Sequence, residues 1–106
     1  MAKYLFTVSY SAEGLKGLYK DKASGRMAAI ARTVEGLGGK LESGYFALGE
    51  HDVILIVDLP DNVAASAVSL TASSTGLLRA QTTALLTPEE TDKALGTSVN
   101  YRGPGT

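Results

Sequence analysis

The chain has 106 residues, a mass of 11.0 kDa and a formal net charge of −1, with 44% hydrophobic and 20% charged residues. These values are typical of one globular domain spanning residues 1–106, and they exclude an intrinsically disordered chain. The ten Lys and Arg residues form no basic run, so we expect no nucleic acid partner. Cysteine is absent and the single histidine has no zinc-ligand spacing around it, so we expect no disulfide, no metal and no cofactor.

The amino terminus enters a strand pattern at once. No charged segment followed by an apolar core and a cleavage site precedes it, so nothing indicates secretion and we expect a cytoplasmic protein. The longest apolar runs, 53–57 and 63–70, are shorter than the roughly 20 residues that span a bilayer. We therefore predict no membrane segment and no membrane partner.

The first part of the chain predicts a strand followed by a long helix. Residues 4–10 alternate, with aromatic and branched side chains on one side and mainly hydroxyl side chains on the other. A helix begins after Ser11 and keeps apolar residues at helical spacing until a stop at Gly38-Gly39. We expect Gly25 to interrupt this helix or to separate a short helix from a longer one.

The rest of the chain predicts a hairpin, a helix, a strand and a short helix. Residues 40–48 and 52–58 are strand patterns, and their short link makes them an antiparallel hairpin. Pro60-Asp61-Asn62 caps the next helix, whose apolar pattern covers 63–71 and whose stop signal lies within 73–76. A strand over 77–86 follows, and a capping box at 87–90 begins a short helix that extends to about Leu95.

This order predicts an α+β protein with the ferredoxin-like βαββαβ fold, a four-stranded antiparallel sheet and an extra C-terminal helix. The helices of that fold cover one sheet face only. Apolar side chains occupy both sides of the predicted strands, so we expect the other face to be covered as well. Two sheets that pair face to face would form a dimeric α/β barrel with a lumen. A homodimer or a higher homo-oligomer is therefore the expected partner state.

Several short motifs together resemble one family. They are Tyr10 with Glu13-Gly14, Arg26, Leu37-Gly38-Gly39-Lys40, Tyr45-Phe46 with Leu48-Gly49-Glu50, Asp52-Val53, Pro60-Asp61, Leu85 with Thr87-Pro88-Glu89-Glu90, and Tyr101-Arg102 with Pro104-Gly105. On these residues nearly the whole chain resembles the GYD domain family, which implies a dimeric α/β barrel. Where the family motif places Tyr before Asp, this chain has His51 before Asp52. A role of that tyrosine is not carried over.

The hairpin tip carries the first candidate site residues. His51 is a candidate general acid or base, because an imidazole titrates near neutral pH, or else a solvent-facing tip residue. Asp52 either orients His51 or bonds backbone N–H groups of the turn, and neighbouring strand residues point to opposite faces. Arg26 holds an anionic ligand or pairs with a carboxylate such as Asp52 or Glu50.

The other candidate ligand-binding residues lie on predicted strands and in the tail. Tyr10, Tyr45 and Tyr101 either line a pocket or pack as ordinary aromatic side chains. Arg79 shares a strand face with other polar side chains and is a candidate for lining the barrel or for a solvent-exposed sheet edge. Arg102 is a candidate for docking on a neighbouring surface.

Three functions stay open. The favoured one is a homo-oligomer that binds a small organic molecule in the barrel lumen, because Tyr, Arg and His side chains gather near predicted strand ends. The second is a cofactor-independent isomerase, decarboxylase or monooxygenase-like enzyme, as in other dimeric barrel proteins, that uses His51, Asp52, Arg26 and Tyr10. The third is a non-catalytic assembly protein. No phosphate loop and no nucleophile elbow is present, so nucleotide binding and a hydrolase triad are not supported.

Overall fold

The computed structural model describes all residues, 1–106, and contains four strands and three helices. The predicted elements are all present, with strand ends within one or two residues of those expected. In chain order they are β1 (Ala2–Tyr10), α1 (Ala12–Gly36), β2 (Lys40–Phe46), β3 (Val53–Leu59), α2 (Asn62–Ser73), β4 (Leu78–Leu85) and α3 (Pro88–Leu95).

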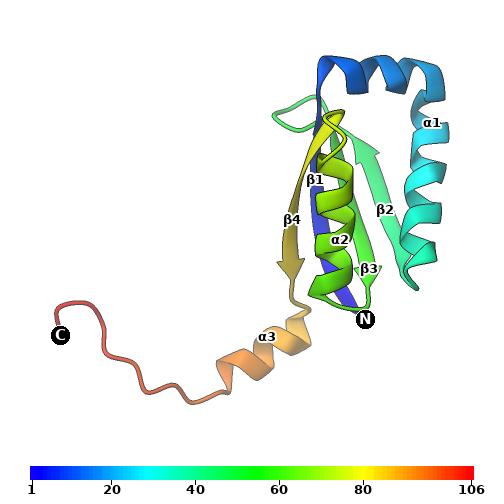
Figure 1. Cartoon of the computed structure of the whole chain (residues 1–106). Coiled ribbons are helices and arrows are strands. Elements are labelled where there is room, and N and C mark those ends of the chain that lie inside the picture. The colour runs from blue at the N-terminus through cyan, green and yellow to red at the C-terminus, as the bar shows by residue number, and fades with distance from the viewer.

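The strands form a single antiparallel sheet in the order β2-β3-β1-β4, with β1 and β3 in the centre. This order confirms the predicted α+β, ferredoxin-like arrangement with an additional C-terminal helix. The helices α1 and α2 lie on the same side of the sheet, because Val34 of α1 and Ala65 of α2 are buried in one cluster with the central strands. Figure 1 shows α3 and the tail projecting away from this body.

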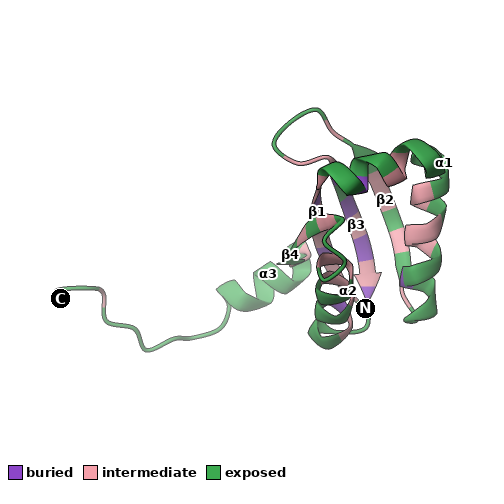
Figure 2. Cartoon of the chain, turned by 45° about the horizontal axis from the view of Figure 1, so that its top comes forward, coloured by how far each residue is buried: buried purple, intermediate pink, exposed green.

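The core lies between the central strands and the helices. Alternating residues of β1 and β3 point toward the helices and are buried, whereas their neighbours are more exposed. Figure 2 shows these buried residues along the middle of the sheet. The buried strand residues are Tyr4, Phe6, Val8, Val53, Leu55, Val57 and Leu59.

The opposite side of the sheet, which we call the open sheet face, has no helix over it. It carries the alternate residues of all four strands, and Tyr45 and Ile54 among them are exposed. Lys3 lies on this face between two carboxylates, 2.8 Å from Asp58 and 2.5 Å from Glu42. The open sheet face is therefore a mixture of apolar side chains and charged groups.

The long helix α1 breaks at Lys22, three residues before the predicted position. Lys22 has φ 63° and ψ 164°, whereas Gly25 continues the helix. The prediction at Gly25 was wrong because a glycine in a helix interior costs only about 1 kcal/mol and packing can override it. The break divides α1 into two segments that run in different directions (Figure 1).

The predicted helix ends are confirmed at the atomic level. Asp61 caps α2 by accepting a hydrogen bond from the Ala64 N–H at 2.9 Å. Thr87 and Glu90 form the expected capping box at α3. Gly38, which follows the end of α1, has a φ of 79° and so ends the helix in the left-handed conformation. No helix in the structure is long and apolar enough to cross a membrane.

Candidate functional site

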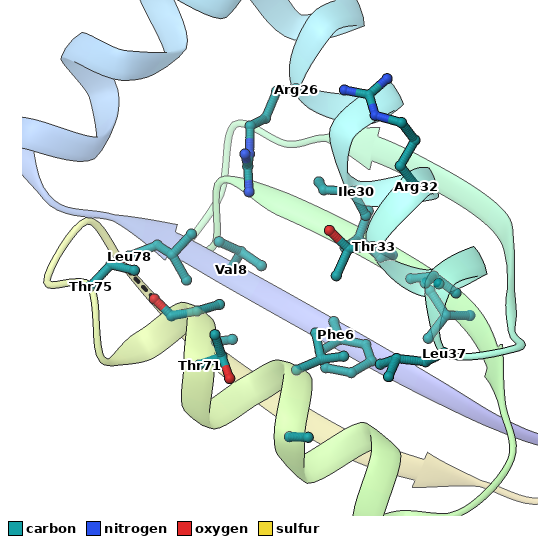
Figure 3. Close-up of a pocket in the computed structure, with 18 of the residues that line it drawn as sticks. Phe6, Val8, Arg26, Ile30, Arg32, Thr33, Leu37, Thr71, Thr75 and Leu78 are labelled. Carbon is teal, nitrogen blue, oxygen red and sulfur yellow. Dashed lines mark hydrogen bonds between the residues drawn. The ribbon is translucent and has the colours of Figure 1, made fainter.

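A groove of about 580 Å³ lies between α1 and α2, over the helix-facing side of β1 and β3. Its volume falls in the range of roughly 300–1,000 Å³ that is usual for small-molecule sites. Most of the lining is apolar, and Figure 3 shows side chains from both helices converging over the strands. The residues that define its floor and sides include Phe6, Val8, Leu55, Ile30, Ala67 and Ala72.

The groove exists because α2 presents small side chains to it. Ala65 is buried against the sheet, so α2 packs closely there, while Ala67 and Ala72 leave space on the groove side. The second segment of α1 lies beside β2 (Figure 1), and the groove remains between this segment and α2. The sequence reasoning missed this groove. Its only local signal in the sequence is the run of Ala, Ser and Thr in 64–75.

Arg26 supplies a positive charge to the groove. Its side chain is half-buried and extends from α1 toward the strands in Figure 3. The three ion pairs of the structure involve Lys3 and Lys16, so the expected pairing of Arg26 with Asp52 or Glu50 is not present. The guanidinium therefore has no carboxylate partner and is available to an anion.

Tyr10 lines the same groove at the end of β1. Burial raises the pKa of the Tyr10 hydroxyl above its usual value of 10.0, and the nearby Arg26 charge opposes this shift without cancelling it. Tyr10 therefore stays protonated at neutral pH and can donate a hydrogen bond. The structure thus brings together two of the sequence-predicted residues, Tyr10 and Arg26.

Asp52 holds the end of β1 in place. Its carboxylate accepts a hydrogen bond from the Tyr10 backbone N–H at 2.8 Å, and its own N–H donates to the Val8 carbonyl at 2.8 Å. The carboxylate is thus used structurally, on a backbone N–H of β1 rather than on the turn itself. This contact fixes the position from which Tyr10 enters the groove.

His51 is not part of the groove. Its Nδ1 lies 3.4 Å from the hydroxyl of Ser9, a residue of the open sheet face that the sequence analysis did not single out. Tyr45 and Arg79 also lie on this face, but they belong to β2 and β4, the two edge strands. The candidates therefore divide between the two sides of the sheet.

Tyr101 and Arg102 are remote from both groups. They lie in the tail beyond α3, which projects from the body in Figure 1. The Arg102 guanidinium donates to the Thr106 backbone carbonyl, so its contact is within the tail. Across the chain, no three His, Cys, Asp or Glu side chains gather as a metal site.

The fold defines the class of protein as a ferredoxin-like α+β domain with a groove between its helices α1 and α2. The family model of the GYD domain matches residues 4–95, which include all strands and helices except the first residues of β1. The chain belongs to the GYD domain family. A comparison with curated proteins gives no match.

Proposed function

We propose that this protein binds a small organic anion, with an apolar body and one acidic group, in the groove between α1 and α2. The observation that carries the proposal is the half-buried Arg26 guanidinium, which has no carboxylate partner and lies in an otherwise mainly apolar groove. Charge-assisted hydrogen bonds from Arg to a carboxylate are among the strongest that proteins use.

The two ends of such a ligand would be held by different forces. The apolar body gains about 25 cal/mol for each Å² removed from water, which favours contact with Phe6, Val8 and Ile30. The acidic group pairs with Arg26 and accepts a hydrogen bond from the protonated Tyr10 hydroxyl. A neutral analogue of the same shape would keep the apolar contacts but lose the charge-assisted hydrogen bond to Arg26.

This proposal places the ligand on the helix side of the sheet rather than in a barrel lumen. Arg26 and Tyr10 both line the groove, whereas Lys3 on the open sheet face is already paired with Asp58 and Glu42. A lumen between two sheets remains a second proposal for oligomers, and it draws support from the exposed Tyr45 and Arg79 on that face.

Binding is favoured over proton-transfer catalysis by the composition of the groove. Its lining contains the Tyr10 hydroxyl and two arginines but no carboxylate and no imidazole. A cycle of general acid and base catalysis needs a group that accepts a proton near neutral pH, and the groove offers none. His51, the natural candidate, lies with Ser9 on the other side of the sheet.

The test is calorimetric titration of the full chain with straight-chain and aromatic carboxylates, each paired with its neutral amide. We expect saturable binding of a carboxylate and much weaker binding of the amide. Arg26→Gln should weaken carboxylate binding by roughly ten- to 100-fold, because hydrogen bonds to charged groups contribute about 1.5–3 kcal/mol. The control is Lys20→Gln, which removes an exposed positive charge from the same helix outside the groove.

Two results would contradict the proposal. One is the absence of binding across the carboxylate panel. The other is an equal loss of affinity in Arg26→Gln and Lys20→Gln, which would reduce the role of Arg26 to that of any surface charge.

A further inference from the structure

The last part of the chain, 87–106, forms an arm that lies outside the body of the domain. Figures 1 and 2 show α3 and the tail extending away from the sheet, with nearly every residue exposed. The side-chain hydrogen bonds of the arm all stay within it, such as Thr97 to Lys93 and Thr106 to Gly103. Nothing in the chain itself therefore holds the arm in its position.

The arm is nevertheless a specified structure. Its helix has a complete capping box at Thr87 and Glu90, with Pro88 in the first turn. An eight-residue helix alone in water is only marginally stable, and helices of this length are normally held by tertiary packing. A strongly encoded helix without a packing partner in its own chain indicates a partner outside it.

Apolar side chains of the arm and of the residue before it are exposed. Leu95 is 79% exposed and Tyr101 is 74% exposed, and Leu86 and Val99 are similarly open to solvent. Side chains of this kind on a segment that leaves the fold mark an interaction surface rather than part of a core.

The open sheet face is a matching surface on the same chain. Its apolar centre consists of Leu5, Ile54 and Ile56, with Tyr45 beside them on β2. Two of its cations, Lys40 and Arg79, form no ion pair. The helix α3 carries three carboxylates and one ammonium group, a net charge of −2. Apolar groups and charges are thus complementary between arm and face.

We propose that the C-terminal arm of one chain docks on the open sheet face of a second copy of this chain. The arm of the second copy docks in the same way on the open sheet face of the first. Each chain carries one arm and one receiving face, so a two-fold axis satisfies both at once and closes the assembly as a dimer. The proposal is independent of the groove, which lies on the opposite side of the sheet. It is an alternative to the lumen between two facing sheets, because the docked arm and the lumen would occupy the same open sheet face.

The first test is the oligomeric state of the full chain by light scattering over a range of concentrations. We expect a dimer for the wild type. The double variant Leu95→Ser and Val99→Ser should raise the dimer dissociation constant by at least about tenfold, because it removes apolar contact from the arm. Tyr19→Ser is the matched control, since Tyr19 is 80% exposed on α1 and lies outside the interface.

The second test locates the contact and uses the absence of native cysteine. Chains carrying Leu95→Cys are mixed with chains carrying Ile54→Cys and oxidised gently. We expect disulfide-linked pairs of the two kinds, and few such pairs when Tyr19→Cys replaces Leu95→Cys. A wild-type monomer at all concentrations would overturn the proposal. A dimer that forms no more Leu95–Ile54 links than the Tyr19→Cys control would also overturn it. This includes a dimer whose dissociation constant the double variant leaves unchanged.

Discussion

At the scale of single residues, the different directions of neighbouring side chains decide which candidates can act together. His51 and Asp52 are neighbours in the sequence, yet His51 contacts Ser9 of the open sheet face and Asp52 contacts the backbone of Tyr10. The sequence identified Tyr10 and Arg26 correctly as polar groups near a strand end and a helix. The enzyme hypothesis grouped these two residues with His51 and Asp52. Only Tyr10 and Arg26 share one groove in the structure, where the path of α1 brings them together across 16 positions of sequence.

The titration of Tyr10 directly tests whether the Arg26 charge acts on the Tyr10 hydroxyl. Its pKa is raised above 10.0 mainly by burial, and Arg26 lowers it in part. We expect Arg26→Gln to raise the pKa of Tyr10 further, since the opposing charge is lost. The measurement is the phenolate absorbance of each protein minus that of the corresponding Tyr10→Phe variant, which removes the contribution of the other four tyrosines. An unchanged or lower Tyr10 pKa in Arg26→Gln would show that the guanidinium does not act on the hydroxyl.

The same shift has a consequence for stability. A raised pKa means that the folded state holds the Tyr10 proton more tightly than the unfolded chain. The corresponding stability is complete below about pH 10 and declines as the pH rises through the folded pKa. Tyr10→Phe should remove this part of the alkaline decline, while the similar contribution of Lys3, whose pKa is also raised by its contacts with Asp58 and Glu42, remains.

At the scale of elements, close backbone contacts fix the start of α1 more strictly than its periodicity does. Gly14 is buried where the first turn of α1 meets the chain before β4, and Ser11 donates its N–H to the Leu77 carbonyl at 2.9 Å. A Cβ at Gly14 would lie 1.8 Å from that carbonyl oxygen. The sequence predicted this helix and its end at Gly38-Gly39. It did not predict the break at Lys22, because the direction of each segment is set by contacts with β2 and with Leu77 before β4 rather than by local preference.

Two glycines of α1 provide a matched pair for this contact. Gly14→Ala should destabilise the protein by roughly 1–3 kcal/mol or more, because the new methyl group overlaps backbone atoms that cannot move away easily. Gly17→Ala places its Cβ in open space and should stabilise the helix by up to about 1 kcal/mol. Urea unfolding of both variants measures the difference in the free energy of unfolding. Equal effects at the two positions would contradict the close approach at Leu77.

At the scale of the whole molecule, the sequence predicted the four-stranded antiparallel sheet and the one-sided helix layer but neither the groove nor the path of the arm. Alternation in β1 and β3 and the caps at Asp61 and Thr87 are local signals, and each was confirmed. The width of the groove depends on where α1 lies relative to α2. That distance is set by many weak contacts between segments far apart in the sequence, and no local pattern encodes it.

The most direct test of the proposed anion site is a titration of the isotope-labelled full chain with a binding carboxylate, followed by NMR of the backbone amides. We expect saturable shifts at residues of the groove, such as Ile30, Ala67 and Ala72, with little change at Thr7 and Ile54 on the open sheet face. We also expect Arg26→Gln to require roughly ten- to 100-fold more ligand for the same shifts. Shifts centred on the open sheet face, or shifts that Arg26→Gln leaves intact, would contradict the proposed site.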